Sequence, residues 1–597
     1  MKTIAPAKNK LSAKILFFII FFVAVVHWGP SSDLYIYLKQ IYLCLISVIL
    51  IILAFAKIKE QKQILIGRFF PVFFACMIFS AVSFLWSVNK FFALKDFIVF
   101  YDIFIVYFAS IILFNKDDIP DALRVIILFG VILGAYDVVV NFNGLFTKTR
   151  LEHLSSLGNP IYLGEYLAIS LSICLGLLIT NISKKDKLEY LVLFTFLFFC
   201  LFLTQTRNSM LALLLLVGFL MLKKIKDPGK LKFLIFAVII MIVMASAFPN
   251  KQYFKRIEGA FDHLKTSRAS SEVKKEKDGQ LSTLASRLQI YKESLYIVKN
   301  NFPFGVGIGN FSLYHPKYKE KMYNRYEMVR KLYHAEEEII HHTAELGIVG
   351  FIFIIYLFTY ISKLILMTGK IEASDRIKYP LMAVFLTTIS LAIFGFNLHR
   401  IEYIVTFFAC LGFYDILNKP IVINFRNSIS KKIIFISFLI LPIIGLIFYS
   451  RVAISEKYLQ KGLALYFNNN FPDAINVFKK AYNYNSFDEK TIFYLGTSYS
   501  IIGELERAKK FFQRGIECYP YEQRYYANYA TVLIKEGEYK EAEDILNDSA
   551  REIAGNYTAY ERLAFLYNKI YNDLPQARAY HEKAVSICPF LDEPIKK

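Results

Sequence analysis

The sequence predicts an all-α protein: a polytopic membrane bundle of about 12 to 13 spans with a large loop on its outer face, followed by a C-terminal α-solenoid. Three observations predict this fold class. The 597 residues are 56% hydrophobic and 17% aromatic, with a mean hydropathy of +0.41, whereas soluble domains are less apolar. Apolar runs long enough to cross a bilayer recur as far as about residue 450. Beyond them, small and bulky residues recur at an interval of about 34 residues.

The spans are predicted from runs of about 17 to 25 apolar residues, the length that crosses the hydrocarbon core. Such runs occur at residues 14–30, 35–56, 67–86, 91–114, 122–142, 160–181, 188–206, 208–222, 231–248, 344–366, 379–398, 401–417 and 433–450. Lysines precede the first run but no small-residue cleavage site follows it, so we expect this run to be retained as a helix. The predicted membrane domain covers residues 1–450.

Lysine and arginine predict the orientation, because basic loops resist translocation and stay cytoplasmic. Alternate loops are rich in these residues: 1–14, 57–68, 115–118, 183–187, 223–230, 363–378 and 418–432. The loops between them hold only scattered ones: Lys39, Lys90, Lys95, Lys148, Arg150, Arg207 and Arg400. We therefore expect a multi-pass protein of the bacterial inner membrane with a cytoplasmic N-terminus. A large loop at about 249–343 and everything after Tyr449 would lie on the outer, periplasmic side.

Composition and motifs weaken several other functional classes. The net charge of +21 needs no nucleic-acid partner, since much of it is lysine beside membrane helices. The seven cysteines show neither CxxC nor framework spacing, so neither a metal knuckle nor a disulfide scaffold is indicated. The GVGIGN stretch at 305–310 lacks the lysine of a phosphate-binding loop and follows no strand of an α/β unit. We expect no cofactor.

Residues 454–597 are predicted to form about four helix pairs of the tetratricopeptide type, whose period is about 34 residues. Repeats that begin at 454, 488 and 522 keep small and bulky residues in phase. The small residues are Gly462, Gly496, Ala530, Ala474, Ala508 and Ala542, and the bulky ones are Phe478, Phe512 and Leu546. A fourth unit begins near 556 and slips by one residue. Such a solenoid offers a concave surface to a partner, so we expect it to supply binding rather than chemistry.

Two polar stretches begin predicted spans at the outer face of the membrane. In GNPIYLGEYLAI, Asn159 stands at the start of a span, where free backbone N–H groups can receive an anion or a carbonyl. In TQTRNSM, Arg207 lies between two apolar runs. A cation at membrane depth is costly, which indicates a functional site.

Two further stretches lie in and after the predicted outer loop. The segment 286–311 joins Arg287 to a glycine-rich turn, and LYHAEEEIIHHTAELGIVGF at 332–351 gathers histidines and carboxylates ahead of a span. A metal site is one interpretation of the second segment, because Glu338 and His341 have the i, i+3 spacing of di-metal carboxylate proteins. A second such pair is missing from the sequence, so we expect no metal.

Together these stretches resemble the O-antigen ligase and polysaccharide polymerase family of membrane glycosyltransferases, over roughly residues 15–420. The most specific part of the resemblance is the order of three elements. A TxTRN-like turn with Arg207 comes first, Arg287 followed by PxGxGxGNF comes second, and a histidine-rich segment that ends in AELGxxG comes third. Family members commonly carry a His-Ala-His-Asn run in that third element. Here His334 keeps the first histidine, while Glu336 and Glu337 replace the second histidine and the asparagine.

The resemblance implies transfer of a glycan from a polyprenyl-diphosphate carrier to a hydroxyl acceptor, without a metal. Arg207 and Arg287 are candidates for the diphosphate, because guanidinium groups hold phosphate oxygens in a bidentate fork. His334 is the candidate base for the acceptor hydroxyl, and Glu336 either orients it or acts in its place. Asn159 and His341 are weaker candidates for substrate binding.

Three functions stay open at this point. The first is a ligase that attaches a lipid-linked glycan to a lipid or protein acceptor, and the second is a polymerase that extends a lipid-linked glycan at the same site. The third is a transporter or an envelope scaffold without enzymatic activity. A transporter should show helix breaks at the membrane midplane, whereas the polar residues here gather at one face. The repeats favour a protein or another large acceptor, and a protein partner could bind their surface.

Overall fold

The structure is a computed structural model, and it describes residues 10–26, 32–61, 63–140, 157, 159–180, 183–222, 235, 238–239, 283–320, 332, 334–335, 337–367, 377–394, 397–418, 420–424 and 428–591. The chain forms two compact units. The bundle unit comprises Met1–Met77, Ile98–Ser270 and Phe353–Leu446. The repeat unit comprises Ile78–Phe97, Ser271–Ile352 and Ile447–Lys597.

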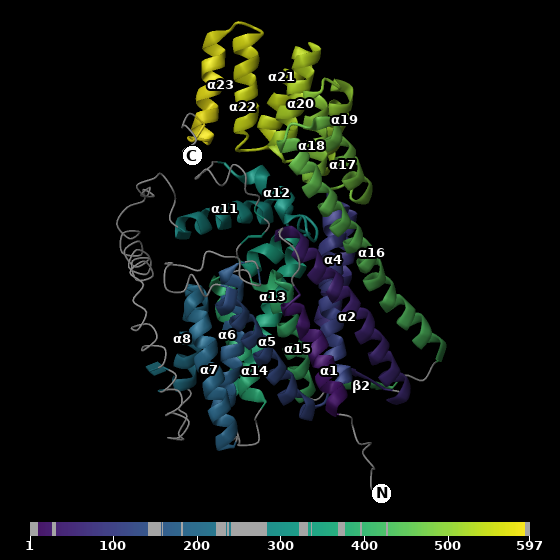
Figure 1. The fold of residues 1–597 in the computed structure, drawn as a ribbon, viewed down its shortest axis with the longest axis vertical. Helices are drawn as coiled ribbons and strands as arrows, with labels where there is room; N and C mark the ends of the chain where they lie inside the picture. Colours follow the sequence, from purple (N-terminus) through teal and green to yellow (C-terminus); the bar gives the residue numbers. More distant parts are fainter. Residues whose placement is uncertain are drawn as a thin grey trace. The chain divides into compact units, whose positions relative to one another are not determined.

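Long apolar helices that run side by side build the bundle unit (Figure 1). Those that lie wholly in it are α1 (Lys10–Phe21), α2 (Ser32–Gln61), α5 (Ile119–Val140), α6 (Pro160–Leu178), α7 (Lys184–Thr204), α8 (Arg207–Leu222), α14 (Lys378–Phe394) and α15 (Ile401–Leu417). Four helices contribute residues to both units: α3 (Phe70–Val82), α4 (Lys90–Leu113), α13 (Glu338–Met367) and α16 (Ser428–Phe467). Short 3-10 turns lie at Phe22–Ala24, Ser83–Leu85, Lys116–Asp118 and Asn397–His399.

Within the described residues, seven helical stretches are long and apolar enough to cross a membrane: Ile36–Gln61, Lys90–Leu113, Lys116–Val140, Pro160–Leu178, Lys184–Thr204, Glu338–Leu366 and Ile433–Phe467. Four apolar helices are shorter: Ala13–Ala24, Phe70–Leu85, Arg207–Met221 and Lys378–Ile393. Twelve of the thirteen predicted spans coincide with a described helix, and the predicted span 231–248 falls almost wholly outside the described residues. The predicted multi-pass helical bundle is confirmed.

One small antiparallel sheet joins two loops of the bundle unit. Strand β1 (Gln63–Ile66) pairs with β2 (Ile421–Asn424), so that Gln63 lies opposite Asn424 and Ile66 opposite Ile421. The sequence predicts these segments only as basic loops. The lysine count predicts both loops on the same side of the membrane, and the strand pairing is compatible with that prediction.

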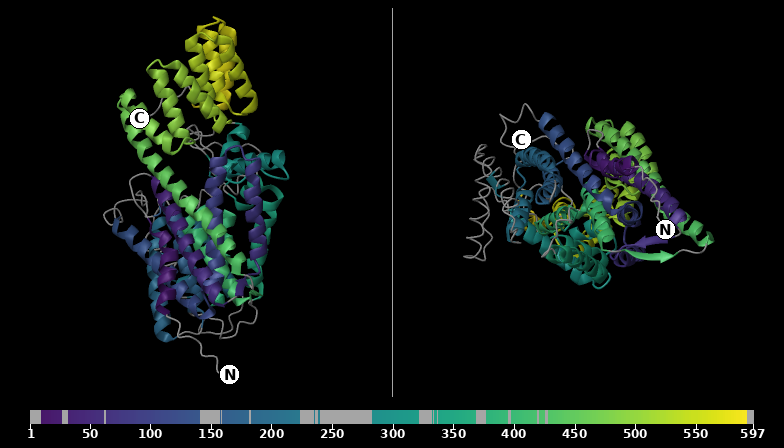
Figure 2. Two further views of the ribbon diagram at one scale, coloured as in Figure 1. Left: turned by 90° about the vertical axis from the view of Figure 1, so that its right-hand side faces the viewer. Right: turned by 90° about the horizontal axis from the view of Figure 1, so that it is seen from below.

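The repeat unit contains the C-terminal solenoid and a layer of loop helices (Figure 2). The loop helices are α11 (Thr283–Asn301) and α12 (Phe311–Tyr318). The solenoid helices that follow α16 are α17 (Phe471–Tyr484), α18 (Glu489–Ile501), α19 (Leu505–Cys518), α20 (Gln523–Glu536), α21 (Tyr539–Glu552), α22 (Tyr557–Lys569) and α23 (Leu574–Ile587). Helix α16 is one helix of 40 residues, and its C-terminal part is the first helix of the first repeat.

The residues that the period singles out form the core of the solenoid. Ala474, Ala508 and Ala542 are fully buried, and the Phe512 ring packs directly on Gly496, where an added Cβ would lie 2.6 Å from Cε1 of that ring. Gly462 has the same relation to the Phe478 ring. Small residues therefore admit the bulky ones of the paired helix, and the predicted repeat is confirmed.

Within the repeat unit, the solenoid packs against the residue just before α4 and against α12. Nδ2 of Asn89 donates to the carbonyl of Cys518 at 3.0 Å, and the backbone N–H of Ala554 donates to the carbonyl of Lys317 at 3.1 Å. The Lys317 ammonium lies 3.3 Å from the Glu552 carboxylate and 4.9 Å from the centre of the Tyr521 ring. Burial acts to lower the pKa of Lys317, but Tyr521 and Glu552 outweigh it and raise the pKa. The ammonium therefore stays charged at this contact.

Candidate functional site

The glycine-rich turn of the repeat unit is held by backbone contacts. Gly305, Gly307 and Gly309 all have a positive φ, of 76°, 89° and 73°. Neighbouring groups occupy the space that a Cβ would need at each of these glycines. At Gly309, for example, an added Cβ would lie only 2.5 Å from the carbonyl oxygen of Phe92. A side chain at these positions would be strained and would collide. The glycines are therefore required by the fold of this turn.

The AELGxxG element, residues 344–350, is hydrogen-bonded to that turn. The N–H of Val306 donates to the carbonyl of Ala344 at 2.9 Å, and the N–H of Gly307 donates to the carbonyl of Glu345 at 2.8 Å. Gly347 has φ 58°, which kinks α13, and a Cβ there would collide with the carbonyl of Pro303. Two motifs about 40 residues apart in the sequence thus form one backbone structure.

Glu345 connects this backbone structure to the histidines. One of its oxygens accepts the backbone N–H of Phe311, the first residue of α12, at 3.2 Å. The same oxygen lies 3.7 Å from Nε2 of His341, and both side chains are buried. Because a helix start presents free N–H groups and a positive dipole end, a carboxylate is stabilised there. Glu345 therefore links α12 to the imidazole of His341.

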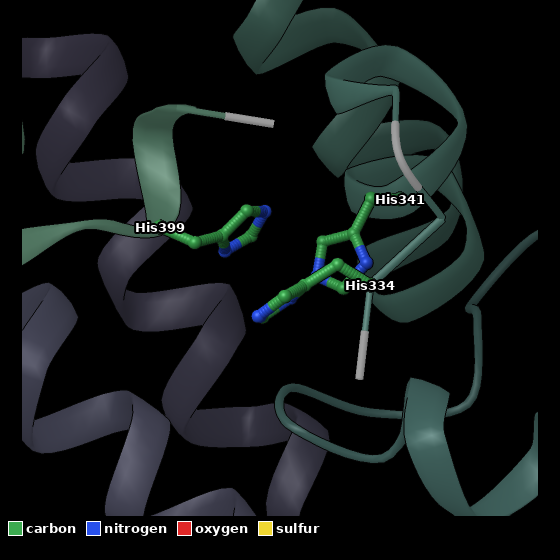
Figure 3. Close-up of side chains that lie close together, drawn as sticks. All are labelled: His334, His341 and His399. Atoms are coloured by element: carbon green, nitrogen blue, oxygen red, sulfur yellow. The ribbon is translucent and has the colours of Figure 1, made fainter. Parts of the chain in front are cut away.

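His334 faces His341 (Figure 3). Their ring centres are 5.2 Å apart, with an angle of 67° between the planes. The Phe311 ring also packs against His341, and the centres of these two rings are 5.1 Å apart. His334 is half-buried and His341 is 3% exposed. The two imidazoles and the Phe311 ring therefore form one cluster of rings.

The two remaining predicted residues of this unit fall in different places. Arg287 is half-buried on α11, which packs against α12. Glu336 lies outside the described residues. Two residues that the sequence analysis passes over, His315 on α12 and Glu293 on α11, form a buried contact of 2.9 Å between Nε2 and Oε2. This contact fixes α12 against the helix that carries Arg287.

The carboxylate and histidine pairs that form contacts are spaced by four residues, whereas the pair considered as a metal site, Glu338 and His341, is spaced by three. His342 lies 3.6 Å from Glu338, and His341 lies 3.7 Å from Glu345, both at i, i+4. Among the described residues of the repeat unit, His334 and His341 fall in one group of possible metal ligands, and Glu338 and His342 fall in another. His399, which Figure 3 also labels, belongs to the bundle unit, in the turn Asn397–His399.

The bundle unit holds Asn159 and Arg207 at the starts of two neighbouring helices. The Asn159 side chain caps α6 by accepting the N–H of Ile161 at 2.9 Å. Arg207 is the first residue of α8 and is exposed. The side chain of Thr206 packs on Gly164, which leaves no room for a Cβ, so the start of α8 lies against the first turns of α6. The two predicted residues are thus brought to neighbouring helix ends.

Glu345 is not among the site residues predicted from the sequence. A signal for it was present, because this glutamate follows His341 by four residues, the spacing that brings two side chains to one face of a helix. Nothing in the local sequence indicates the His315 and Glu293 contact, which joins separate helices.

The fold and these motifs define a multi-pass membrane protein with a helical-repeat domain. Residues 192–355 match the model of the family described as O-antigen ligase. The predicted resemblance is thereby confirmed over these residues. This match supports a membrane enzyme that transfers or polymerises glycans, and it implies a lipid-linked glycan as substrate. No curated protein sequence matches the chain.

Several solved structures are similar to part of the chain. A crystal structure of MamA is 20% identical, covers 24% of this chain and 79% of its own, and gives a TM-score of 0.21. A thermophilic tetratricopeptide-repeat protein of Thermus thermophilus is 16% identical. The similarity covers 23% of this chain and 75% of that protein, with a TM-score of 0.21. PilF of Pseudomonas aeruginosa is 19% identical. The similarity covers 24% of this chain and 64% of PilF, with a TM-score of 0.22.

Proposed function

We propose that the protein transfers a glycan from a polyprenyl-diphosphate carrier to a hydroxyl acceptor, lipid or protein, at the outer face of the bacterial inner membrane. In this proposal the N-terminus is cytoplasmic, and the repeat unit faces the periplasm. The observation that carries it is the joint structure of the glycine-rich turn and the AELGxxG element, which holds His341 and Glu345 beside His334. The family match covers the same elements.

The reaction needs a proton acceptor and a stabilised leaving group. The acceptor oxygen attacks C1 of the sugar, the bond from C1 to the diphosphate oxygen breaks, and the diphosphate leaves with the electron pair. His334 takes the hydroxyl proton, with His341 facing it and Glu345 behind His341. Glu336 remains the alternative base. Arg207 and Arg287 are assigned to the diphosphate, whose negative charge grows as the bond breaks.

Product analysis tests this function. The full chain is placed in proteoliposomes with a lipid-linked glycan and a candidate acceptor, and the lipid-linked and acceptor fractions are separated. We expect the glycan to disappear from the lipid and appear on the acceptor, in buffer with chelator as well as without. Longer lipid-linked chains instead would identify a polymerase. If neither product forms with any acceptor class, the enzymatic function is wrong.

The repeat surface is assigned to the acceptor or to a protein partner. A solenoid presents an extended concave surface, which suits a polypeptide better than a repeating sugar. The contacts of Lys317 with Tyr521 and Glu552 support this assignment, because they tie the solenoid to α12, whose first residue, Phe311, contacts His341.

A further inference from the structure

Arg400 is a bundle-unit cation that none of the assigned roles uses. It directly precedes α15, and its guanidinium carbon lies 3.1 Å from the centre of the Tyr162 ring, in the first turn of α6. The side chain is half-buried. Among the residues that the structure describes, the guanidinium donates no hydrogen bond and forms no ion pair. Its five N–H donors are therefore available to an acceptor that is not part of the chain.

Glu402, two residues after Arg400, already has an ion-pair partner. Oε2 of Glu402 accepts a hydrogen bond from the Lys39 ammonium at 3.1 Å, and these side chains are only 5% and 3% exposed. A buried ion pair of this kind holds its partners tightly, since removing either one leaves an unpaired buried charge. Glu402 is therefore engaged by Lys39. Arg400 also acts on Glu402 electrostatically, but no ion pair joins these two side chains, and the N–H fork of Arg400 has no acceptor among the described residues.

The position of Arg400 is electrostatically unfavourable for the protein alone. It stands at the N-cap of α15 without capping that helix through its side chain, and it stacks on the first turn of α6. Both are positive ends of helix dipoles, where a cation costs stability and an anion gains it. Arg207 occupies a similar position at the start of α8, which packs on α6. Positive helix ends and guanidinium groups thus accumulate around the N-terminus of α6.

We propose that Arg400 binds a phosphate oxygen of a diphosphate ligand at the N-terminal end of α6, as a second arginine of the bundle unit beside Arg207. The inference rests on the proposed function, because the diphosphate it assigns is that of the lipid carrier. The Tyr162 ring holds the guanidinium plane, which leaves the N–H fork to face two oxygens. A guanidinium is suited to this task because it keeps its proton and binds phosphate bidentately.

Binding of inorganic pyrophosphate to the purified full-length protein tests the site without any glycan transfer. Affinity is measured by calorimetry for the wild type, Arg400→Gln and Arg400→Lys. We expect Arg400→Gln to weaken binding about tenfold or more, the size of a lost charge-assisted hydrogen bond. Arg400→Lys should recover only part of the loss, because an ammonium lacks the fork. The lysine variant keeps the test valid if the glutamine variant does not fold.

Two further variants separate the site from general effects. Tyr162→Leu should weaken pyrophosphate binding less than Arg400→Gln does, since it removes the ring that orients the guanidinium but keeps the charge. Arg451→Ala is the matched control. That arginine also lies over a tyrosine ring, 6.0 Å from the centre of Tyr484, but donates to the carbonyl of Asn483 at 3.0 Å. Its loss should leave pyrophosphate binding unchanged.

The source of the diphosphate is decided with vesicles. Wild-type protein should bind vesicles with polyprenyl diphosphate more tightly than vesicles with phosphatidylglycerol, and Arg400→Gln should abolish that preference. Equal loss for both lipids would show a general headgroup anchor and overturn the proposal. So would a wild type that does not bind pyrophosphate, or a folded Arg400→Gln variant that binds it like the wild type.

The outcomes also separate this inference from the proposed function. Arg400-dependent pyrophosphate binding in a protein that transfers no glycan would retain the diphosphate site and reject the transferase. Glycan transfer by the wild type, with unchanged binding and transfer in Arg400→Gln, would reject the role of Arg400 alone.

Discussion

Glycine has different functions in two regions of the repeat unit. In the glycine-rich turn and the AELGxxG element, Gly305 and Gly347 have positive φ and face backbone carbonyls. In the solenoid, Gly462 and Gly496 lie inside regular helices and face the rings of Phe478 and Phe512. A backbone carbonyl held in a hydrogen-bonded turn cannot move away from a new side chain, whereas a ring can be exchanged for a smaller group. The first region should therefore tolerate no substitution, and the second should tolerate compensated ones.

The same contrast extends to the polar residues. The motif region buries its carboxylates and imidazoles in contact with one another, as Glu345 and His341 show. The solenoid keeps its ion pairs at the surface, as with Lys509 and Glu538 at 2.8 Å. Exposed pairs contribute about 0 to 1 kcal/mol, so the solenoid depends on packing. The motif region combines packing with groups that can do chemistry.

The largest expected effect concerns His334. His334→Ala should reduce glycan transfer by about 10²-fold or more, the usual contribution of a general base, while the protein stays inserted in the membrane. Transfer is measured in proteoliposomes, and insertion by extraction of membranes. His342→Ala is the control, because His342 pairs with Glu338 rather than with His334, and its loss should be smaller. If Glu336→Gln removes transfer and His334→Ala does not, Glu336 is the base.

Gly347→Ala should have the next largest effect. Gly347 has φ 58° and ψ −138°, a sparsely populated conformation that costs a non-glycine residue about 1 to 3 kcal/mol, and the new Cβ would also collide with the Pro303 carbonyl. We expect transfer to fall about tenfold or more as the joint backbone structure opens. Gly218→Ala in α8 is the matched control, since nothing lies within 4 Å of a Cβ there. Wild-type transfer by Gly347→Ala would contradict the proposed role of the interlocked motifs.

The sequence predicts features that local patterns determine. Span positions follow from apolar runs, and the solenoid core follows from a repeated spacing, so the spacing alone identifies Ala508 and Phe512 as core residues. The pairing of β1 with β2 is not predictable in this way, because its strands are about 350 residues apart and too short to show a period. The hydrogen bond from the Phe311 N–H to Glu345 is missed for the same reason. Motif order indicates which residues matter, whereas only the fold shows which ones touch.

Tyr521→Ala tests whether the solenoid supports the motif region. Tyr521 contacts Lys317 and packs against Tyr314, with ring centres 5.3 Å apart and an angle of 55° between the ring planes. A cation–π contact and an aromatic pair together contribute about 1 to 3 kcal/mol. We expect a lower unfolding temperature and a loss of transfer of a few fold. Tyr571→Ala, which removes a contact with Tyr567 near the C-terminal end of the solenoid, should lower stability without affecting transfer. Equal transfer in both variants would mean that the solenoid acts only in partner binding.

Gly496→Ala should have the smallest effect and should be reversible by a second change. The new Cβ would lie 2.6 Å from the Phe512 ring, which costs about 1 to 3 kcal/mol of overpacking. Phe512→Leu alone also destabilises, because it leaves space in a buried core. The double variant should be more stable than the sum of the two single changes predicts, by about 0.5 kcal/mol or more in the free energy of unfolding. Purely additive values would show that the ring does not determine the need for glycine, and the contrast between the two regions would then fail.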